Sequence, residues 1–174
     1  LNRGRVYQII KDYEKALVDL TSAIDLDKED PELYDYRADC YIEMEKYTDA
    51  LKDLDKAIDL DKENPKWYNN RADCYTEMEK YTDALKDYAT AVEISTDDRE
   101  TARAINNSAN IYWEQEKWEL CIKEYTKAIA AFPDAIYYSN RGRVYQIIKD
   151  YEKALVDLTS AIDLDKEDPE LYDY

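Results

Sequence analysis

The chain has 174 residues, of which 45% are hydrophobic and 37% charged, with only 2 glycines and 4 prolines. This scarcity of turn-forming residues predicts helices. The 41 acidic and 24 basic residues give a formal net charge of −17, which repels nucleic-acid phosphates and anionic membrane surfaces, so neither is expected as a partner. No apolar stretch approaches the roughly 20 residues that a membrane-spanning helix needs.

The cysteines indicate the compartment. Cys40, Cys74 and Cys121 are scattered and odd in number, unlike the disulfide framework of a small secreted protein. A reducing, cytoplasmic environment is therefore expected. No charged-then-apolar leader precedes the first repeat, but the chain does not begin with Met, so a removed leader stays an open alternative.

The sequence is repetitive on two scales. Residues 2–36 return unchanged at 140–174, which indicates either recent duplication or deliberate construction. Within this long period lies a shorter one, with shifts of 34, 34, 37 and 33 residues. It relates Tyr7, Tyr41, Tyr75, Tyr112 and Tyr145. A period of this size is typical of a stacked array of helical units.

Each unit is predicted to be a pair of helices within one array over 1–174. The expected hairpins cover residues of about 1–30 (partial), 31–64, 65–101, 102–134 and 135–168, with a stub at 169–174. First helices are expected after Asp30-Pro31, Asn64-Pro65 and Asp168-Pro169, since an acid or amide caps the helix and proline suits its first position. Second helices are expected near Thr48-Asp49, Thr82-Asp83 and Asp150-Tyr151-Glu152.

Small and large residues alternate at fixed places in every unit. Small residues recur at the positions of Ala38, Ala50 and Ala57, and aromatic residues at those of Tyr41 and Tyr47. In this order the chain resembles the tetratricopeptide repeat family over almost its whole length. The resemblance implies an all-helical, right-handed solenoid of antiparallel hairpins, in which the first helix of each hairpin lines a concave groove that binds proteins.

Catalysis is not expected. The chain has no histidine, the commonest general base and metal ligand, and no phosphate-binding glycine loop. Acid pairs such as Asp25/Asp27 and Asp59/Asp61 are interpreted as solvated helix ends, and the cysteines as small apolar fillers. We therefore expect no enzyme activity, no cofactor and no metal.

The resemblance assigns a polar set of groove residues. They are Asn2, Asp35, Tyr36, Asp39, Lys66, Asn69, Asn70, Asp73, Arg103, Asn106, Asn107, Asn110, Trp113, Asn140 and Arg143. The acids in the first half favour a partner segment that carries Lys or Arg. Lysines are missing where the chaperone-adaptor branch of the family grips a terminal carboxylate, so that clamp is not expected.

Asparagine recurs at one groove position, in Asn2, Asn70, Asn107 and Asn140. An amide that both donates and accepts can bind the main chain of an extended peptide. The pattern is similar to the asparagine ladder of the tetratricopeptide arm of O-GlcNAc transferase, although Tyr36 interrupts it. The alternative interpretation is that these asparagines are tolerated helix-surface residues.

Three functions follow as hypotheses. The first is a scaffold that holds an extended or helical segment of a partner protein in the groove. The second is a self-assembling array that stacks head to tail, the stub at 169–174 supplying turns before Asn2 of the next copy. The third is the regulatory arm of an enzyme whose catalytic domain lies outside this sequence.

Overall fold

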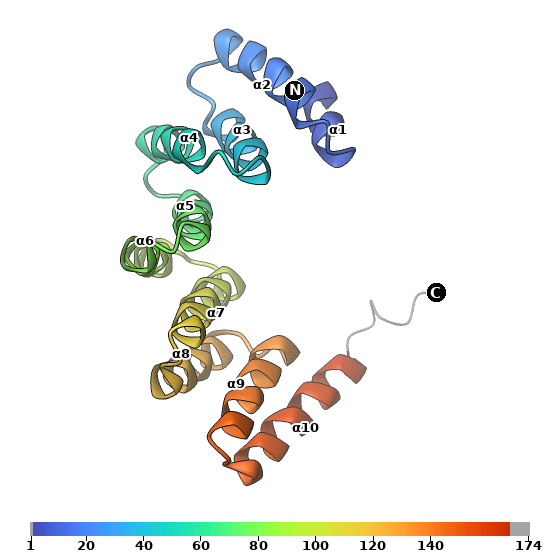
Figure 1. The fold of residues 1–174 in the computed structure, drawn as a ribbon, viewed down its shortest axis with the longest axis vertical. Coiled ribbons are helices and arrows are strands. Elements are labelled where there is room, and N and C mark those ends of the chain that lie inside the picture. The colour runs from blue at the N-terminus through green and yellow to red at the C-terminus, as the bar shows by residue number, and fades with distance from the viewer. Residues whose placement is uncertain (1, 168–174) are drawn as a thin grey trace. The chain divides into compact units, whose positions relative to one another are not determined.

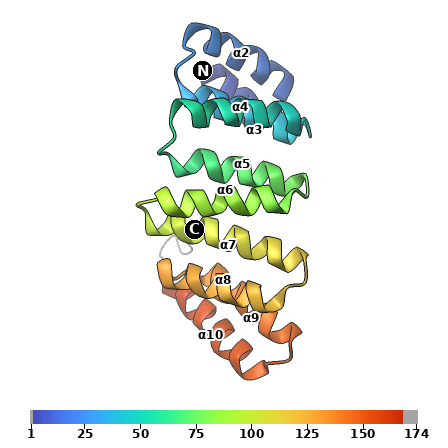
Figure 2. The same ribbon diagram turned by 90° about the vertical axis from the view of Figure 1, so that its left-hand side faces the viewer.

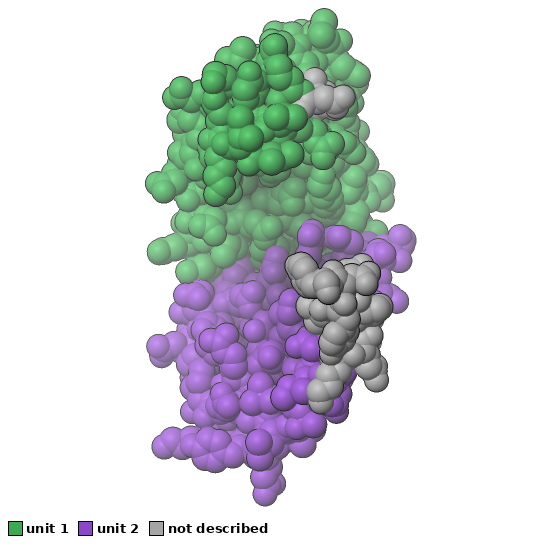
Figure 3. All heavy atoms as spheres, turned by 90° about the vertical axis from the view of Figure 1, so that its right-hand side faces the viewer, with its two compact units in different colours: residues 1–94 green, residues 95–174 purple. Residues whose placement is uncertain are grey.

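The computed structural model describes residues 2–167, which form ten helices and no strand. The predicted stub at 169–174 and the cap at Asp168-Pro169 lie outside the described residues. The chain forms two compact units, Leu1–Ile94 and Ser95–Tyr174, coloured separately in Figure 3.

The first unit holds three helical hairpins (Figures 1 and 2). They pair α1 (Asn2–Ile9) with α2 (Tyr13–Leu26), α3 (Pro31–Glu43) with α4 (Tyr47–Leu60), and α5 (Pro65–Glu77) with α6 (Tyr81–Ile94). Between hairpins, α2 packs on α3 and α4 on α5. We call the first helix of each hairpin the A helix and the second the B helix.

The second unit holds two hairpins. They pair α7 (Asp98–Glu114) with α8 (Trp118–Ala131), and α9 (Ala135–Ile147) with α10 (Tyr151–Glu167). The B helix α8 packs on the following A helix α9, which repeats the order seen in the first unit.

The predicted caps of the A helices are confirmed. Asp30 and Asn64 accept hydrogen bonds from the backbone N–H of Glu32 and Lys66, and a proline follows each cap as the first helical residue. The B helices begin near the expected residues: α10 starts at Tyr151, and α4 starts at Tyr47, with Lys46 at its N-terminal cap position and no side-chain cap. Asp49 lies in the first turn of α4, where its charge suits the helix dipole.

Each described hairpin turns through one residue in the left-handed region. Lys11, Glu45, Glu79, Glu116 and Lys149 have φ between 55° and 64°. The backbone N–H of the next residue then bonds back into the A helix, as Lys46 N does to the Tyr41 carbonyl at 2.8 Å. The same turn therefore closes each hairpin.

The predicted small positions are buried where helices meet. Ala38, Ala50, Ala57, Ala72 and Ala84 are each 0% exposed. Large side chains fill the space between them, including Leu54 and Trp67, which are 0% and 1% exposed. The core is thus a row of close helix contacts inside each unit.

A recurring ion pair joins the A helix to the B helix of the same hairpin. In each pair the arginine Nε and Nη2 donate to both carboxylate oxygens of the aspartate, at 2.6 to 2.8 Å. The pairs are Arg3–Asp19, Arg37–Asp53, Arg71–Asp87 and Arg141–Asp157. The hairpin α7–α8 has Ser108 and Glu124 at the equivalent positions, and Glu124 instead accepts from Lys127 within its own helix.

Most of these arginines also reach the B helix of the preceding hairpin. Nη1 of Arg37 donates to Thr21 at 3.2 Å, Nη1 of Arg71 to Asp55 at 2.6 Å, and Nη1 of Arg141 to Thr126 at 2.9 Å. One guanidinium therefore ties three helices together, a geometry that lysine cannot reproduce.

Candidate functional site

The expected groove residues lie on the A helices, and their exposure divides them into three groups. Exposed side chains are those of Asp39, Asp73, Arg103, Asn110 and Arg143. Partly buried ones are those of Tyr36, Lys66, Asn70, Asn107, Trp113 and Asn140. Asp35, Asn69 and Asn106 are buried. Asn2 begins α1, and its side chain lies outside the described part of the structure.

The buried members connect successive A helices. Asp35 on α3 is 1% exposed, and its carboxylate accepts from Nδ2 of Asn70 at 2.6 Å and pairs with Nζ of Lys66 at 2.9 Å, both on α5. In the second unit, Asn106 on α7 accepts from Nδ2 of Asn140 on α9 at 3.2 Å. Asn70 and Asn140, two members of the proposed ladder, each use one amide proton inside their own unit.

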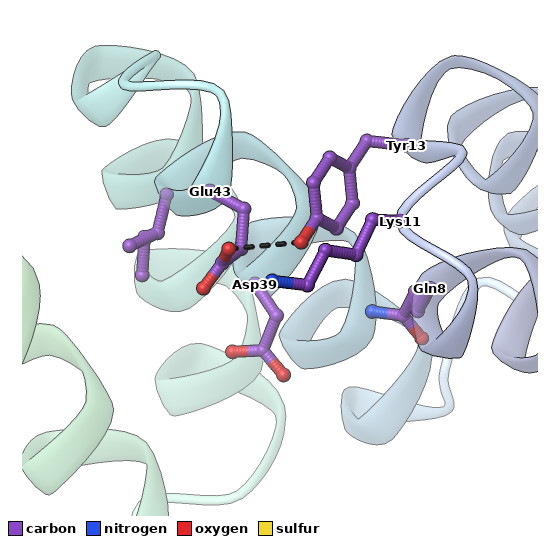
Figure 4. Close-up of a pocket in the computed structure, with 6 residues that line it drawn as sticks. Gln8, Lys11, Tyr13, Asp39 and Glu43 are labelled. Atoms are coloured by element: carbon purple, nitrogen blue, oxygen red, sulfur yellow. Dashed lines mark hydrogen bonds between the residues drawn. The ribbon is translucent and has the colours of Figure 1, made fainter.

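A hollow of about 350 Å³ opens between the first two hairpins (Figure 4). It is lined by Gln8, Lys11, Tyr13, Asp39, Ile42 and Glu43. The Tyr13 hydroxyl donates to Glu43 Oε2 at 2.8 Å, which fixes one acid at the wall. Gln8 Nε2 donates to the carbonyl of Tyr36 at 2.8 Å, so its amide is also held in place.

Two carboxylates, those of Asp39 and Glu43, and the ammonium of Lys11 line this hollow (Figure 4). Partial loss of water around Asp39, together with the neighbouring carboxylates of Asp35, Glu43 and Asp73, raises the pKa of Asp39 to about 7, although Lys66 opposes the shift. A bound cation would favour the charged form of this carboxyl.

Tyr36, which interrupts the asparagine series, lies between two cations. The guanidinium carbon of Arg5 is 5.0 Å from the centre of its ring, and Nζ of Lys66 is 5.7 Å from it. Stacking of this kind is favourable and orders long side chains. Tyr36 therefore orders the side chains of Arg5 and Lys66.

The second unit carries a hollow of about 250 Å³ on its own A helices. Its lining residues are Asn110, Trp113, Glu114, Tyr125, Asn140 and Arg143. The Trp113 ring meets Trp118 edge to face at 5.5 Å, and the guanidinium carbon of Arg143 lies 5.2 Å from the centre of the Trp113 ring. The sequence-predicted Asn110, Trp113, Asn140 and Arg143 are thus brought together here.

Two B-helix tyrosines that sequence reasoning assigned no role position groove residues. The hydroxyl of Tyr88 donates to Asp73, and that of Tyr125 donates to Oδ1 of Asn110 at 2.7 Å. Both rings are 2% exposed. The other hairpins have leucine at the same repeat position, as Leu20, Leu54 and Leu158. The change from leucine to tyrosine was the feature of the sequence that could have indicated this role.

The cysteines behave as the sequence predicted. Cys40, Cys74 and Cys121 are unpaired and 0% exposed, and burial raises the pKa of each thiol to about 11. They pack as small apolar groups. Among the described residues, no cluster of three or more acids and cysteines is arranged to hold a metal ion, and no helix has the length and apolar character to cross a membrane.

Comparison with protein families identifies this architecture. Four models of the tetratricopeptide repeat match, at residues 1–30, 38–79, 63–134 and 106–169. The chain belongs to the tetratricopeptide repeat family. A comparison with curated proteins found no match.

Solved structures share the fold at low sequence identity. MamA from Desulfovibrio magneticus RS-1 is 21% identical with a TM-score of 0.76, over 97% of this chain and 94% of its own. PilF of Pseudomonas aeruginosa is 17% identical with a TM-score of 0.81, over 93% and 73%. YrrB, described as a tetratricopeptide repeat protein with an unusual peptide-binding site, is 23% identical with a TM-score of 0.66, over 98% and 87%. These similarities establish a tetratricopeptide solenoid of helical hairpins.

Proposed function

We propose that this protein is a non-enzymatic scaffold that binds a segment of a partner protein along the A helices, and that the first unit takes a segment bearing Lys or Arg. The observation that carries the proposal is the acidic hollow between α1 and α3. Family membership supports a protein-interaction role, and the peptide-binding site named for YrrB is compatible with it.

The lining of the hollow matches the two parts of a lysine or arginine side chain. Asp39 and Glu43 offer carboxylates for the charged head, while Ile42 and the Tyr13 ring offer an apolar wall for the methylene stem. A cation placed there also returns Asp39 to its charged state. Charge complementarity of this kind sets specificity and speeds association more than it adds raw affinity.

Direct contact is assigned to the exposed and partly buried groove residues. In the second unit these are Arg103, Asn107, Asn110, Trp113, Asn140 and Arg143, among which an aromatic ring and amides suit an extended main chain. Asp35, Asn69 and Asn106 are buried, so we assign them a positioning role. The buried, unpaired thiols favour a reducing, cytoplasmic setting for the scaffold.

The test begins with the selection, from a displayed library of random peptides, of those that bind the whole chain. Selected peptides should be rich in Lys and Arg, and their affinity should fall steeply with salt. Asp39→Asn and Glu43→Gln should each weaken a selected peptide by about 1 kcal/mol, measured by calorimetry. Glu63→Gln is the matched control, because Glu63 is exposed in the turn between α4 and α5.

Two results would contradict the proposal. One is a library that returns no peptide enriched in basic residues. The other is a basic peptide whose affinity is the same for the two groove variants and for the Glu63 control.

A further inference from the structure

Apolar side chains are exposed on one face of α1 and one face of α10. On α1, Val6 is 52% exposed, and on α10, Leu155 and Ile162 are 68% and 54% exposed. Both faces lie in the duplicated segment, so each has a twin of identical sequence: α9 for α1, and α2 for α10. The twins are covered, and they show what fits each face.

The twin of the α10 face is covered by an A helix. Leu17, equivalent to Leu155, is partly buried in a cluster with Leu20 and with Cys40 of α3. Ile24, equivalent to Ile162, is only 7% exposed, because it packs in a cluster with residues of α3. The sequence of α10 therefore has a face that fits an A helix.

The twin of the α1 face is covered by a B helix. Val144, equivalent to Val6, is 0% exposed and packs with Cys121 and Tyr125 of α8. Cys40 and Cys74 occupy the same repeat position in other hairpins and are also 0% exposed. The sequence of α1 therefore has a face that fits a B helix.

We infer that α10 of one molecule packs on α1 of a second copy of this chain, as α8 packs on α9 and α2 on α3. Val6 of the second copy lies over Ala154 and Leu158, the equivalents of Ala16 and Leu20, which pack with Cys40. Because one face differs from the other, the contact is heterologous and can add further copies.

A polar contact supports the same pairing. The Arg3 side chain is 75% exposed, whereas its twin Arg141 is 16% exposed and donates through Nη1 to Thr126 Oγ1 of α8. Thr126 meanwhile donates to the carbonyl four residues earlier, which leaves its oxygen to accept. Thr159 on α10 makes the same bond to the Leu155 carbonyl at 2.8 Å, and its sequence twin Thr21 accepts from Arg37. In the assembly, Arg3 Nη1 of one copy donates to Thr159 of the other.

The duplication also supplies a matched control. Val18 and Val156 are twins and are both 66% exposed, although only the helix of Val18 is covered. Val156 therefore lies outside the docking face, while Leu155 beside it lies within. Leu155→Glu and Val156→Glu add the same charge to adjacent exposed positions of one helix.

The experiment is sedimentation velocity from micromolar to millimolar protein, with circular dichroism to verify folding. The wild type should grow in mass with concentration, and Val156→Glu should follow it. Val6→Glu and Leu155→Glu should each weaken association roughly tenfold or more, because a carboxylate would be buried in an apolar contact. An equimolar mixture of Val6→Glu and Leu155→Glu should give dimers and nothing larger, because each variant retains one intact face.

Several outcomes would overturn the inference. A wild type that stays monomeric throughout would do so. Self-association of Val6→Glu at wild-type strength would show that α10 faces pair with each other. A mixture of the two variants that stays monomeric would show that α1 and α10 do not meet.

Discussion

At the scale of single residues, Asp39 combines a proposed binding role with a cost to the fold. Its pKa of about 7 lies above the ordinary value of 3.8, because partial loss of water and the carboxylates of Asp35, Glu43 and Asp73 disfavour its charge. The folded state therefore holds the Asp39 proton more tightly than the unfolded chain does. The contribution of Asp39 to the free energy of unfolding is therefore fully present below about pH 4, and it is lost as the pH rises through about 7.

Asp39→Asn should therefore stabilise the protein above pH 7 and leave its stability unchanged near pH 4. The measurement is the free energy of unfolding of wild type and variant, by urea titration at both pH values. Glu77→Gln, an exposed change on α5, serves as the control. A difference between wild type and Asp39→Asn that is the same at both pH values would contradict the raised pKa.

At the scale of helices, the repeated arginine–aspartate pair decides how strongly a hairpin is closed. Arg71 and Asp87 are 19% and 6% exposed at their side chains, and Arg71 also reaches Asp55 of the preceding hairpin. Arg3 and Asp19 make the same two-point contact, but the Arg3 side chain is 75% exposed. Water therefore screens the Arg3–Asp19 pair much more than the Arg71–Asp87 pair.

Arg71→Ala should destabilise the fold by about 3 to 5 kcal/mol, because it leaves the buried Asp87 carboxylate unpaired. Arg3→Ala should destabilise the fold much less, because an exposed ion pair contributes little. Chemical denaturation of the two variants gives the comparison. Equal losses would mean that burial does not set the strength of this contact.

Much of the fold was predictable because it rests on local signals. Asp30 and Asn64 precede a proline, and small residues recur at the positions of Ala38 and Ala50, so cap and packing can be read from spacing alone. The Arg71–Asp87 pair was not predicted, because its partners are 16 residues apart on different helices and no local rule relates them.

The candidate site was predicted in outline, as a face of polar side chains on the A helices. The sequence did not predict which of these side chains are exposed. Asp35 and Asp39 both lie on α3, but Asp35 is buried against the next hairpin, whereas Asp39 is exposed. The positioning by Tyr88 and Tyr125 was missed for a related reason. Neither tyrosine was assigned a role from the sequence, because the partner of each hydroxyl lies 15 residues away on another helix.

At the scale of the whole molecule, substitutions in the described hairpin turns should raise the thermal stability of the protein. Glu45, Glu79, Glu116 and Lys149 occupy left-handed backbone, where a Cβ is crowded and glycine is not. Lys11 shares the conformation but lines the acidic hollow, so it is best kept. A variant with glycine at the other four turns should gain from a few tenths to about 1 kcal/mol per site, after the greater freedom of the unfolded chain is subtracted.

Calorimetric melting of that variant should show a higher transition temperature than the wild type. Ala89→Gly, at an exposed position in the middle of α6, is the opposing control and should lower it, because glycine in a helix interior costs about 1 kcal/mol. A four-glycine variant that melts no higher than its parent would mean that the turns are already relaxed. Because each repeat closes with the same turn, one local substitution can be applied along the chain, and heat resistance would grow in proportion to the number of turns changed.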